Sequence, residues 1–192
     1  TLFGKTGDVK KYMNAISVLS HELRLEIPYE REIFIRINKN INNNDSIVDI
    51  ADEYYSKIID YLMKNNKEKT LAVISIGGYI EGMYFAMNLT EGFSEDSPVV
   101  QRVAEQKLSF ENLEMFTYRF RNDKNAAESI KYLNRINSIF KQFEVKTTKT
   151  KVTHDKPNSF IIEGGSSIVI TKKQYSNLKN TINEIRTQIV EN

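Results

Sequence analysis

The sequence predicts an all-α protein: an up-and-down helical bundle of six to seven helices, with a small β-hairpin before the last helix. Through most of the 192-residue chain, apolar residues recur at three- and four-residue steps, which is the period of a helix that buries one face. Residues 144–167 lose this period and are rich in Thr, Val, Lys and Gly, which favours strands and turns. We therefore expect residues 1–192 to form a single helical-bundle domain, with residues 144–170 as a hairpin or loop insertion.

Residues 71–87, with the sequence LAVISIGGYIEGMYFAM, are the stretch around which we expect the other helices to pack. They carry a single charge, on Glu81, and are apolar nearly all round, which is typical of a helix surrounded by neighbours. A membrane span needs about 20 apolar residues. Because this stretch is slightly shorter and contains a glutamate, we interpret it as the buried central helix of a soluble bundle.

Three helices are expected before the central helix, and residues that favour helix boundaries separate them. Asp8 is a candidate N-cap for the first helix, and Pro28 ends that helix or starts the second. Ser46 and Asp49 resemble a loose capping pair for the third. The expected ranges are 8–25, 29–40 and 46–64.

The boundaries after the central helix are marked more clearly. Ser97 followed by Pro98 is typical of a helix start, because proline lacks the N–H that the first turn leaves without a partner. Thr171 with Gln174 has the spacing of a capping box and opens the last helix. Gly164 and Gly165 indicate a tight turn within the hairpin. The expected helices here are 98–120, 125–143 and a last helix from residue 171.

The composition excludes several classes of function. The formal net charge of +2 is too small to indicate a nucleic-acid partner, and the absence of cysteine excludes disulfides and thiol nucleophiles. Four lysines form a basic patch in the hairpin region. Nucleic-acid binding through this patch is the weakest of three functional options. Acidic residues elsewhere balance it, so we interpret it as a solvated edge. The four lysines are Lys146, Lys149, Lys151 and Lys156.

No catalytic, metal or cofactor motif is present in the sequence. His21 and His154 lack the spacing of paired metal ligands. The Gly164–Gly165 pair has no following phosphate-loop lysine, and Gly77–Gly78 lies inside a helix. We therefore expect no catalytic residue, no metal site and no cofactor.

Glu81 is the most informative single residue. An unpaired buried carboxylate costs several kcal/mol, so Glu81 should have a partner or be protonated. The expected partners are Arg102, Gln106, Lys107 or a tyrosine. A structural ion pair or hydrogen bond is favoured over a binding role, and catalysis is the least favoured. If the role is binding, the candidate residues are Glu81, Tyr84, Gln106 and Tyr79.

Small residues share one face of the central helix. They recur at three- and four-residue steps, and a glycine in a helix interior costs about 1 kcal/mol relative to alanine. We expect another helix to pack closely on this face and to offset that cost. Close approach of a ligand to the backbone is the alternative. The small residues are Ser75, Gly78, Gly82 and Ala86.

Two segments carry a resemblance to a known family. The segments GGYIEGMY at residues 77–84 and AEQKLSFENL at residues 104–113 resemble helical lipoproteins or exported proteins of unknown function from Bacteroides-type bacteria. The likeness covers most of the chain, and Tyr79 stands where a Trp is common in the family. The resemblance implies an all-helical bundle, export, and attachment to the envelope through a lipidated upstream cysteine. It also implies a further helix before residues 1–25, which this chain does not contain.

The expected function follows from these observations. We expect a non-enzymatic cell-envelope protein, in the periplasm or associated with the outer membrane, that binds a ligand or protein partner or serves as a scaffold. Contact with a membrane is expected only through an upstream lipid anchor. The alternative is a small-molecule-binding protein or an enzyme with a polar pocket around Glu81, Tyr84 and Gln106.

Overall fold

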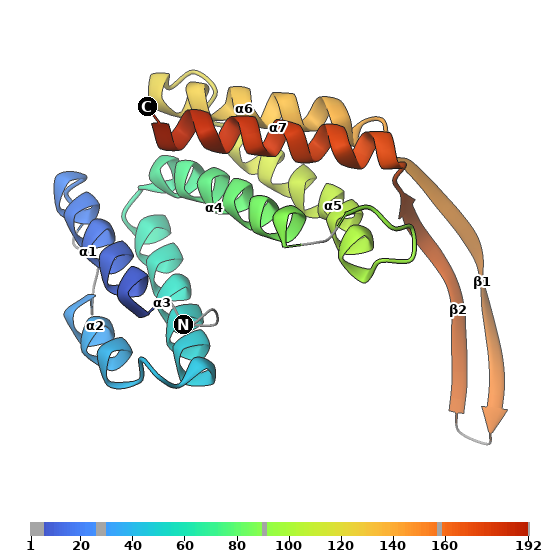
Figure 1. The fold of residues 1–192 in the computed structure, drawn as a ribbon, viewed down its shortest axis with the longest axis horizontal. Coiled ribbons are helices and arrows are strands. Elements are labelled where there is room, and N and C mark those ends of the chain that lie inside the picture. Colours follow the sequence, from blue (N-terminus) through green and yellow to red (C-terminus); the bar gives the residue numbers. More distant parts are fainter. Residues whose placement is uncertain (1–5, 26–29, 90–91, 157–158, 192) are drawn as a thin grey trace. The chain divides into compact units, whose positions relative to one another are not determined.

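The computed structural model describes residues 6–25, 30–89, 92–156 and 159–191. Within these residues the chain forms seven helices and one two-stranded antiparallel hairpin, which lies before the last helix (Figure 1). The predicted all-α class is therefore confirmed. The chain divides into two compact units, Thr1–Leu71 and Ala72–Asn192. The expectation of a single domain stays a prediction.

The first unit contains α1 (Thr6–Glu22), α2 (Glu30–Lys39) and α3 (Asn44–Lys64). Helix α1 begins before Asp8, so the prediction of Asp8 as its N-cap was wrong. The N-cap of α3 is Asn43, whose Oδ1 accepts a hydrogen bond from the Ser46 backbone N–H at 3.1 Å. Ser46 is therefore the residue that is capped, and not the cap that the sequence suggested.

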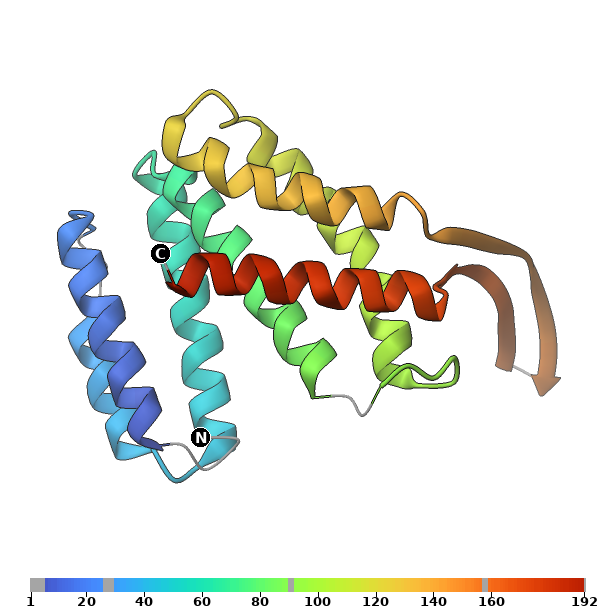
Figure 2. The same ribbon diagram turned by 45° about the horizontal axis from the view of Figure 1, so that its top comes forward.

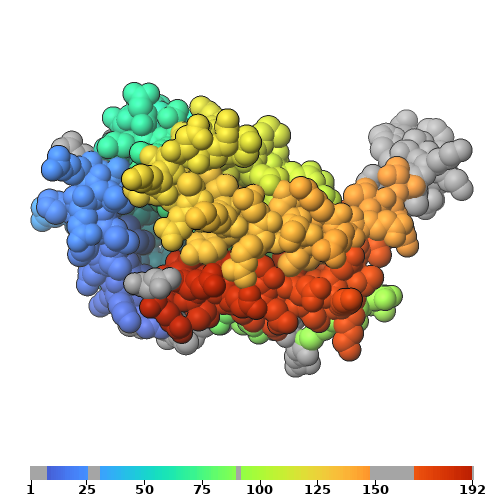
Figure 3. Space-filling model, turned by 90° about the horizontal axis from the view of Figure 1, so that it is seen from above, coloured from blue at the N-terminus to red at the C-terminus, as the bar shows by residue number. Residues whose placement is uncertain are grey.

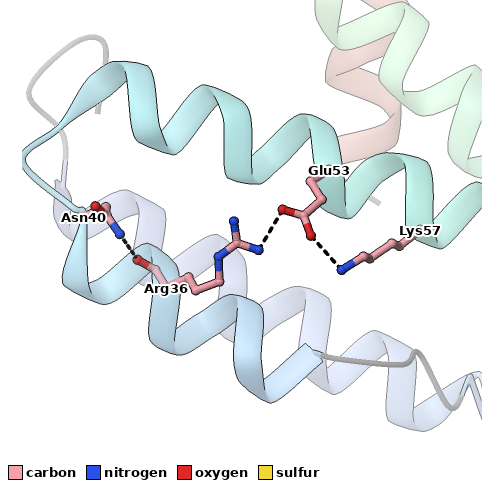
Figure 4. Close-up of polar contacts among 4 residues, drawn as sticks. All are labelled: Arg36, Asn40, Glu53 and Lys57. Atoms are coloured by element: carbon pink, nitrogen blue, oxygen red, sulfur yellow. Dashed lines mark hydrogen bonds and ion pairs between the residues drawn. The ribbon is translucent and has the colours of Figure 1, made fainter.

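Packing of α2 against α3 organises the core of the first unit, which Ile33, Ile37, Ile50 and Tyr54 form. At the edge of this core, Glu53 on α3 bonds to Arg36 on α2 and to Lys57 one turn further along α3, each at 2.7 Å (Figure 4). The hydrogen bonds from Lys57 and Arg36 lower the pKa of the Glu53 carboxyl group. The same arginine offers its backbone carbonyl to the Asn40 side chain, at 2.8 Å.

The second unit contains most of α4 (Glu68–Asn88), together with α5 (Pro98–Tyr118), α6 (Lys124–Phe140) and α7 (Lys172–Glu191). Two of the predicted helix starts are confirmed here. The Ser97 side chain accepts from the Val100 N–H, with Pro98 at the first helical position. The Thr171 N–H donates to Gln174 Oε1 at 2.8 Å, and the Gln174 N–H donates to Thr171 Oγ1 at 3.3 Å, which completes the capping box.

Apolar faces of all four helices meet in the core of this unit. The rings of Phe110 on α5 and Phe140 on α6 lie with centroids 5.1 Å apart. Helices α6 and α7 lie side by side (Figures 2 and 3), where Arg135 of α6 bonds to Glu184 and Gln188 of α7. Helix α5 is joined to α6 by a hydrogen bond from the Asn137 amide to the Glu114 carboxylate.

The hairpin consists of β1 (Glu144–Lys156) and β2 (Ser159–Val169). It leaves the end of α6 and returns to the start of α7, where Ile168 and Ile170 are buried in the core of the unit (Figure 1). The predicted turn at Gly164–Gly165 was wrong. Both glycines lie within β2, and Gly165 stands opposite Thr148 on β1. Residues 157–158, between the two strands, lie outside the described part of the chain.

Candidate functional site

Helix α4 has one buried side and one open side. Ile76, Ile80 and Met83 are buried in the core of the second unit. On the opposite side, Phe85 is 48% exposed and Leu89 is 64% exposed. Within the second unit, neighbours therefore cover only one side of this helix, because an apolar residue pattern all round a helix does not show which side is covered.

The same helix passes a length and composition test for a membrane span. Within the described residues, Glu68–Asn88 is the one helix long and apolar enough, and 33% of its most apolar 18-residue window is buried. The core helix of a soluble protein passes the same test, so the test does not place α4 in a membrane.

The small residues of α4 are divided between its two sides: Ser75 and Ala86 are half-buried, with Ala86 packed against the core, whereas the glycines are exposed. Gly77, Gly78 and Gly82 are exposed, and a Cβ built on any of them would meet no atom within 4 Å outside the helix backbone. Within the second unit, therefore, no helix packs closely on Gly78 and Gly82, and for the rest of the chain the expectation stays a prediction. These glycines leave backbone accessible in the middle of a face whose larger residues are Ile74, Phe85 and Leu89.

A shallow groove of about 340 Å³ runs beside this face, between α4 and α5. Its polar groups are few. The Tyr79 hydroxyl donates to the backbone carbonyl of Gln106 at 3.4 Å, and burial raises the pKa of Tyr79 above its ordinary value. Arg102 lies at the rim with its side chain 81% exposed, and bonds to Glu105 at 3.1 Å. The groove is lined by Gly78, Tyr79, Gly82, Met83, Ala86, Arg102, Val103 and Gln106.

Glu81 lies on the other flank of α4 and is paired with α7. Arg186 Nε donates to one carboxylate oxygen at 2.8 Å, and Arg186 Nη2 donates to the other at 3.2 Å. The guanidinium carbon also stands 4.2 Å from the centre of the Tyr84 ring, within the range of a cation–π contact. The Glu81 side chain is 40% exposed, so this is a half-buried ion pair at the edge of the core.

The partners of Glu81 expected from the sequence were wrong. Arg102 pairs with Glu105, and Lys107 pairs with Glu111 at 2.8 Å. A tyrosine does lie beside Glu81, but Tyr84 contacts the paired Arg186 through its ring. The prediction of a partner is thus confirmed, and the partner is a residue that the sequence analysis missed. The available signal was that Arg186 directly follows Ile185, at the margin of the apolar stripe of α7.

The four candidate binding residues form two separate pairs. Tyr79 and Gln106 lie at the groove between α4 and α5, whereas Glu81 and Tyr84 lie with Arg186 at the contact between α4 and α7. Neither Glu81 nor Tyr84 lines the groove. A binding role for these residues stays a prediction.

The described part of the second unit offers surfaces for non-covalent binding. In the residues that the structure describes, no group of three or more His, Cys, Asp or Glu side chains could hold a metal ion. What the open side of α4 offers is exposed apolar side chains, accessible helix backbone and one arginine at the rim. Comparisons of the chain with protein-family models, with curated proteins and with solved structures gave no match.

Proposed function

We propose that this chain is a non-enzymatic binding protein whose open α4 face docks an apolar helix of a protein partner. The observation that carries the proposal is the open face itself. Three exposed glycines lie midway along an apolar helix, and no described side chain of the second unit occupies the space beside them.

Energetics favour a docking role for this face. Each glycine in a helix interior costs about 1 kcal/mol relative to alanine, so Gly77, Gly78 and Gly82 together cost about 3 kcal/mol. Within the described part of the second unit no contact needs the missing Cβ atoms. Glycines four positions apart on a helix allow a second helix to approach its backbone closely, as Gly78 and Gly82 would. Amphipathic helices bind apolar grooves through anchors at the same spacing.

A labelled helical peptide tests this proposal. The probe is a fluorescein-labelled 20-residue helix with Ala and Leu on one face and Gln and Ser on the other, followed by fluorescence anisotropy. Wild type should bind it, and Gly82→Leu and Phe85→Glu should each weaken binding about tenfold or more. Met115→Glu is the matched control, because Met115 is 71% exposed on α5 and does not line the groove. Equal binding by all four proteins would contradict the proposal.

The proposed setting is the cell envelope. It is supported by the resemblance of residues 77–84 and 104–113 to exported lipoproteins. The full-length gene product should incorporate labelled palmitate and fractionate with membranes. Palmitate-free protein in the soluble cytoplasmic fraction would contradict this part of the proposal and leave the docking role untouched.

The groove supports a second candidate function, binding of a small apolar ligand with a polar group. Its volume of about 340 Å³ and its Tyr79, Arg102 and Gln106 groups suit a small amphipathic molecule. A thermal-shift screen of wild type and Gly82→Leu distinguishes this candidate. A ligand that stabilises wild type, and not the variant with the filled groove, would support it.

A further inference from the structure

We infer that the hairpin of this chain pairs with the hairpin of a second copy, with β2 of one copy antiparallel to β2 of the other in a shared four-stranded sheet. The inference goes beyond the proposed function, because it concerns a different element of the second unit from α4. Three observations carry it: the unpaired backbone of a two-stranded sheet, the protected edge of β1 and the unprotected edge of β2.

The hairpin leaves backbone groups without a strand partner. Within the described residues β1 and β2 form a sheet of two strands, so each strand has one edge that no described strand pairs with. Along such an edge, alternate N–H and C=O groups point away from the sheet. A hairpin of two strands is marginally stable in water unless further strands or a helix pack against it. Among the described side chains, Ile168 and Ile170 supply such packing at the end of the hairpin next to α7.

The strands that would extend this sheet are not among the described residues. The described first unit consists of three helices and short turns, so it contains no strand that could pair with the hairpin. Outside the hairpin, the described second unit again consists of helices and short connections. The edge of a strand binds an extended segment through main-chain hydrogen bonds. The strand that completes the sheet must therefore come from outside these residues.

Strand β1 carries two of the features by which proteins protect a sheet edge from pairing, lysines and a β-bulge. The register shifts between Thr148 and Lys151, so that two residues of β1 stand against Gly164 of β2. Such a bulge bends the strand and interrupts its pairing. Between residues 145 and 154 β1 contains no acidic residue, so a second β1 placed against this edge would bring lysines to lysines. The lysines of β1 are Lys146, Lys149, Lys151 and Lys156.

Strand β2 has neither of these protections. Its residues 159–169 contain no lysine and no proline, and their one charged residue is Glu163. Glu163 stands opposite Lys151 in the hairpin register, so a charge of opposite sign is already beside it in the same hairpin. The consecutive Phe160, Ile161 and Ile162 are residue types that favour a strand. The sequence therefore protects one edge of the sheet and leaves the other open to pairing.

A second β2 strand fits this open edge. In an antiparallel pair related by a two-fold axis, each residue stands opposite the residue at the same distance beyond the axis. An axis at Gly164 puts Glu163 opposite Gly165, and an axis at Ile162 puts it opposite Ile161. In neither register does the glutamate meet its own copy, and the strand carries no other charge. Each copy thus brings both the open edge and a strand that fits it.

The assembly should stop at two copies. Pairing through β2 uses the open edge of each copy and leaves the two β1 edges on the outside of the four-stranded sheet. Lysines and the bulge protect those edges, and a two-fold contact uses the same surface on both copies, so it cannot grow into a filament. The contact extends along at most the 11 residues of β2. Because such an interface is small, we expect the dimer to dissociate at low protein concentration.

Sedimentation equilibrium tests the association. Wild type should be a dimer at high protein concentration and a monomer at low concentration. Ile162→Lys should weaken association about tenfold or more, because it places a lysine in the open edge. Val152→Lys is the matched control: Val152 stands opposite Ile162 on β1, so the variant adds the same charge at the same level of the hairpin, away from that edge. Its association should stay close to that of wild type. Circular dichroism establishes that each variant keeps its helices.

Disulfide trapping tests which edge is used. Because the chain contains no cysteine, Ile162→Cys, Gly164→Cys and Val152→Cys each introduce a single thiol. A residue at the two-fold axis lies opposite its own copy, so at least one of the two β2 variants should form a disulfide-linked dimer on oxidation. Val152→Cys should not, because strands spaced about 4.8 Å apart put the two β1 strands about 14 Å from each other across the shared sheet. Trapping of neither β2 variant, or of Val152→Cys instead, would overturn the pairing.

The outcomes separate this inference from the proposed function. A wild-type chain that is monomeric at every concentration would overturn the inference and leave the docking role of α4 untouched. Equal weakening by Ile162→Lys and Val152→Lys would overturn the choice of β2. Gly82→Leu, which should weaken binding of the helical peptide, should leave the association unchanged. Loss of association in Gly82→Leu would move the contact to α4 and overturn the pairing of hairpins.

Discussion

Replacing Gly78 and Gly82 of α4 by alanine should stabilise the folded protein. In a helix interior, alanine is favoured over glycine by about 0.8–1.0 kcal/mol. At Gly78 and Gly82 the added methyl group meets nothing within 4 Å outside the helix backbone, so no clash reduces this gain. The Gly78→Ala/Gly82→Ala double variant should therefore gain about 1.6–2 kcal/mol in the free energy of unfolding. Urea unfolding followed by circular dichroism measures it.

Gly92→Ala is the internal control for this prediction. Its neighbourhood is equally empty, but its φ of +137° is a conformation that alanine adopts only with strain. We expect Gly92→Ala to destabilise the protein while the two α4 substitutions stabilise it. Loss of stability in Gly78→Ala or Gly82→Ala would refute the open face, because it would mean that another part of the chain packs against these glycines.

Three further predictions concern individual contacts. Breaking the ion pair between Glu81 and Arg186 should lower the free energy of unfolding. A double-mutant cycle with Glu81→Gln and Arg186→Met, measured by urea unfolding, should give a coupling energy of about 1 kcal/mol, which is at the upper end for partly exposed pairs. Additive effects of the two substitutions would contradict this coupling. Because its hydrogen bonds lower the folded-state pKa of Glu53, this carboxylate should stabilise the first unit above its unfolded pKa of about 4.5, with the contribution lost as the pH falls through the lower folded value. In Glu53→Gln, the free energy of unfolding should therefore fall less as the pH is lowered below about 4.5. The same acid dependence in wild type and Glu53→Gln would contradict this role of Glu53. Thr171→Ala should cost about 1 kcal/mol by removing the cap of α7, measured by thermal unfolding against the exposed control Thr187→Ala.

Local signals in the sequence were sufficient for much of the fold. A helix cap involves residues three or four positions apart, so Ser97 and the Thr171–Gln174 box could be read directly. The same reasoning failed at Asp8 and Ser46. Several neighbouring polar residues can each cap the same helix, and the sequence does not show at which of them the helix begins. The glycine pair in the hairpin was misread because glycine fits a strand interior as well as a turn.

The candidate site depended on contacts that the sequence pattern does not specify. Glu81 and Arg186 are 105 positions apart, and no periodicity links a residue on α4 to one on α7. The open side of α4 was missed for a related reason. A helix that is apolar all round looks the same whether neighbours cover all of it or only half, so its small residues were assigned to internal packing. The positions left uncovered appear only once the other helices are placed.

The most direct test of the open α4 face is the reactivity of a single thiol. Because the chain has no cysteine, maleimide labels Gly82→Cys at one site, and its labelling rate reports the accessibility of the face. Labelling should be fast, close to that of Met115→Cys and far above that of the buried Ile80→Cys. Labelling of Gly82→Cys as slow as that of Ile80→Cys would contradict an open face.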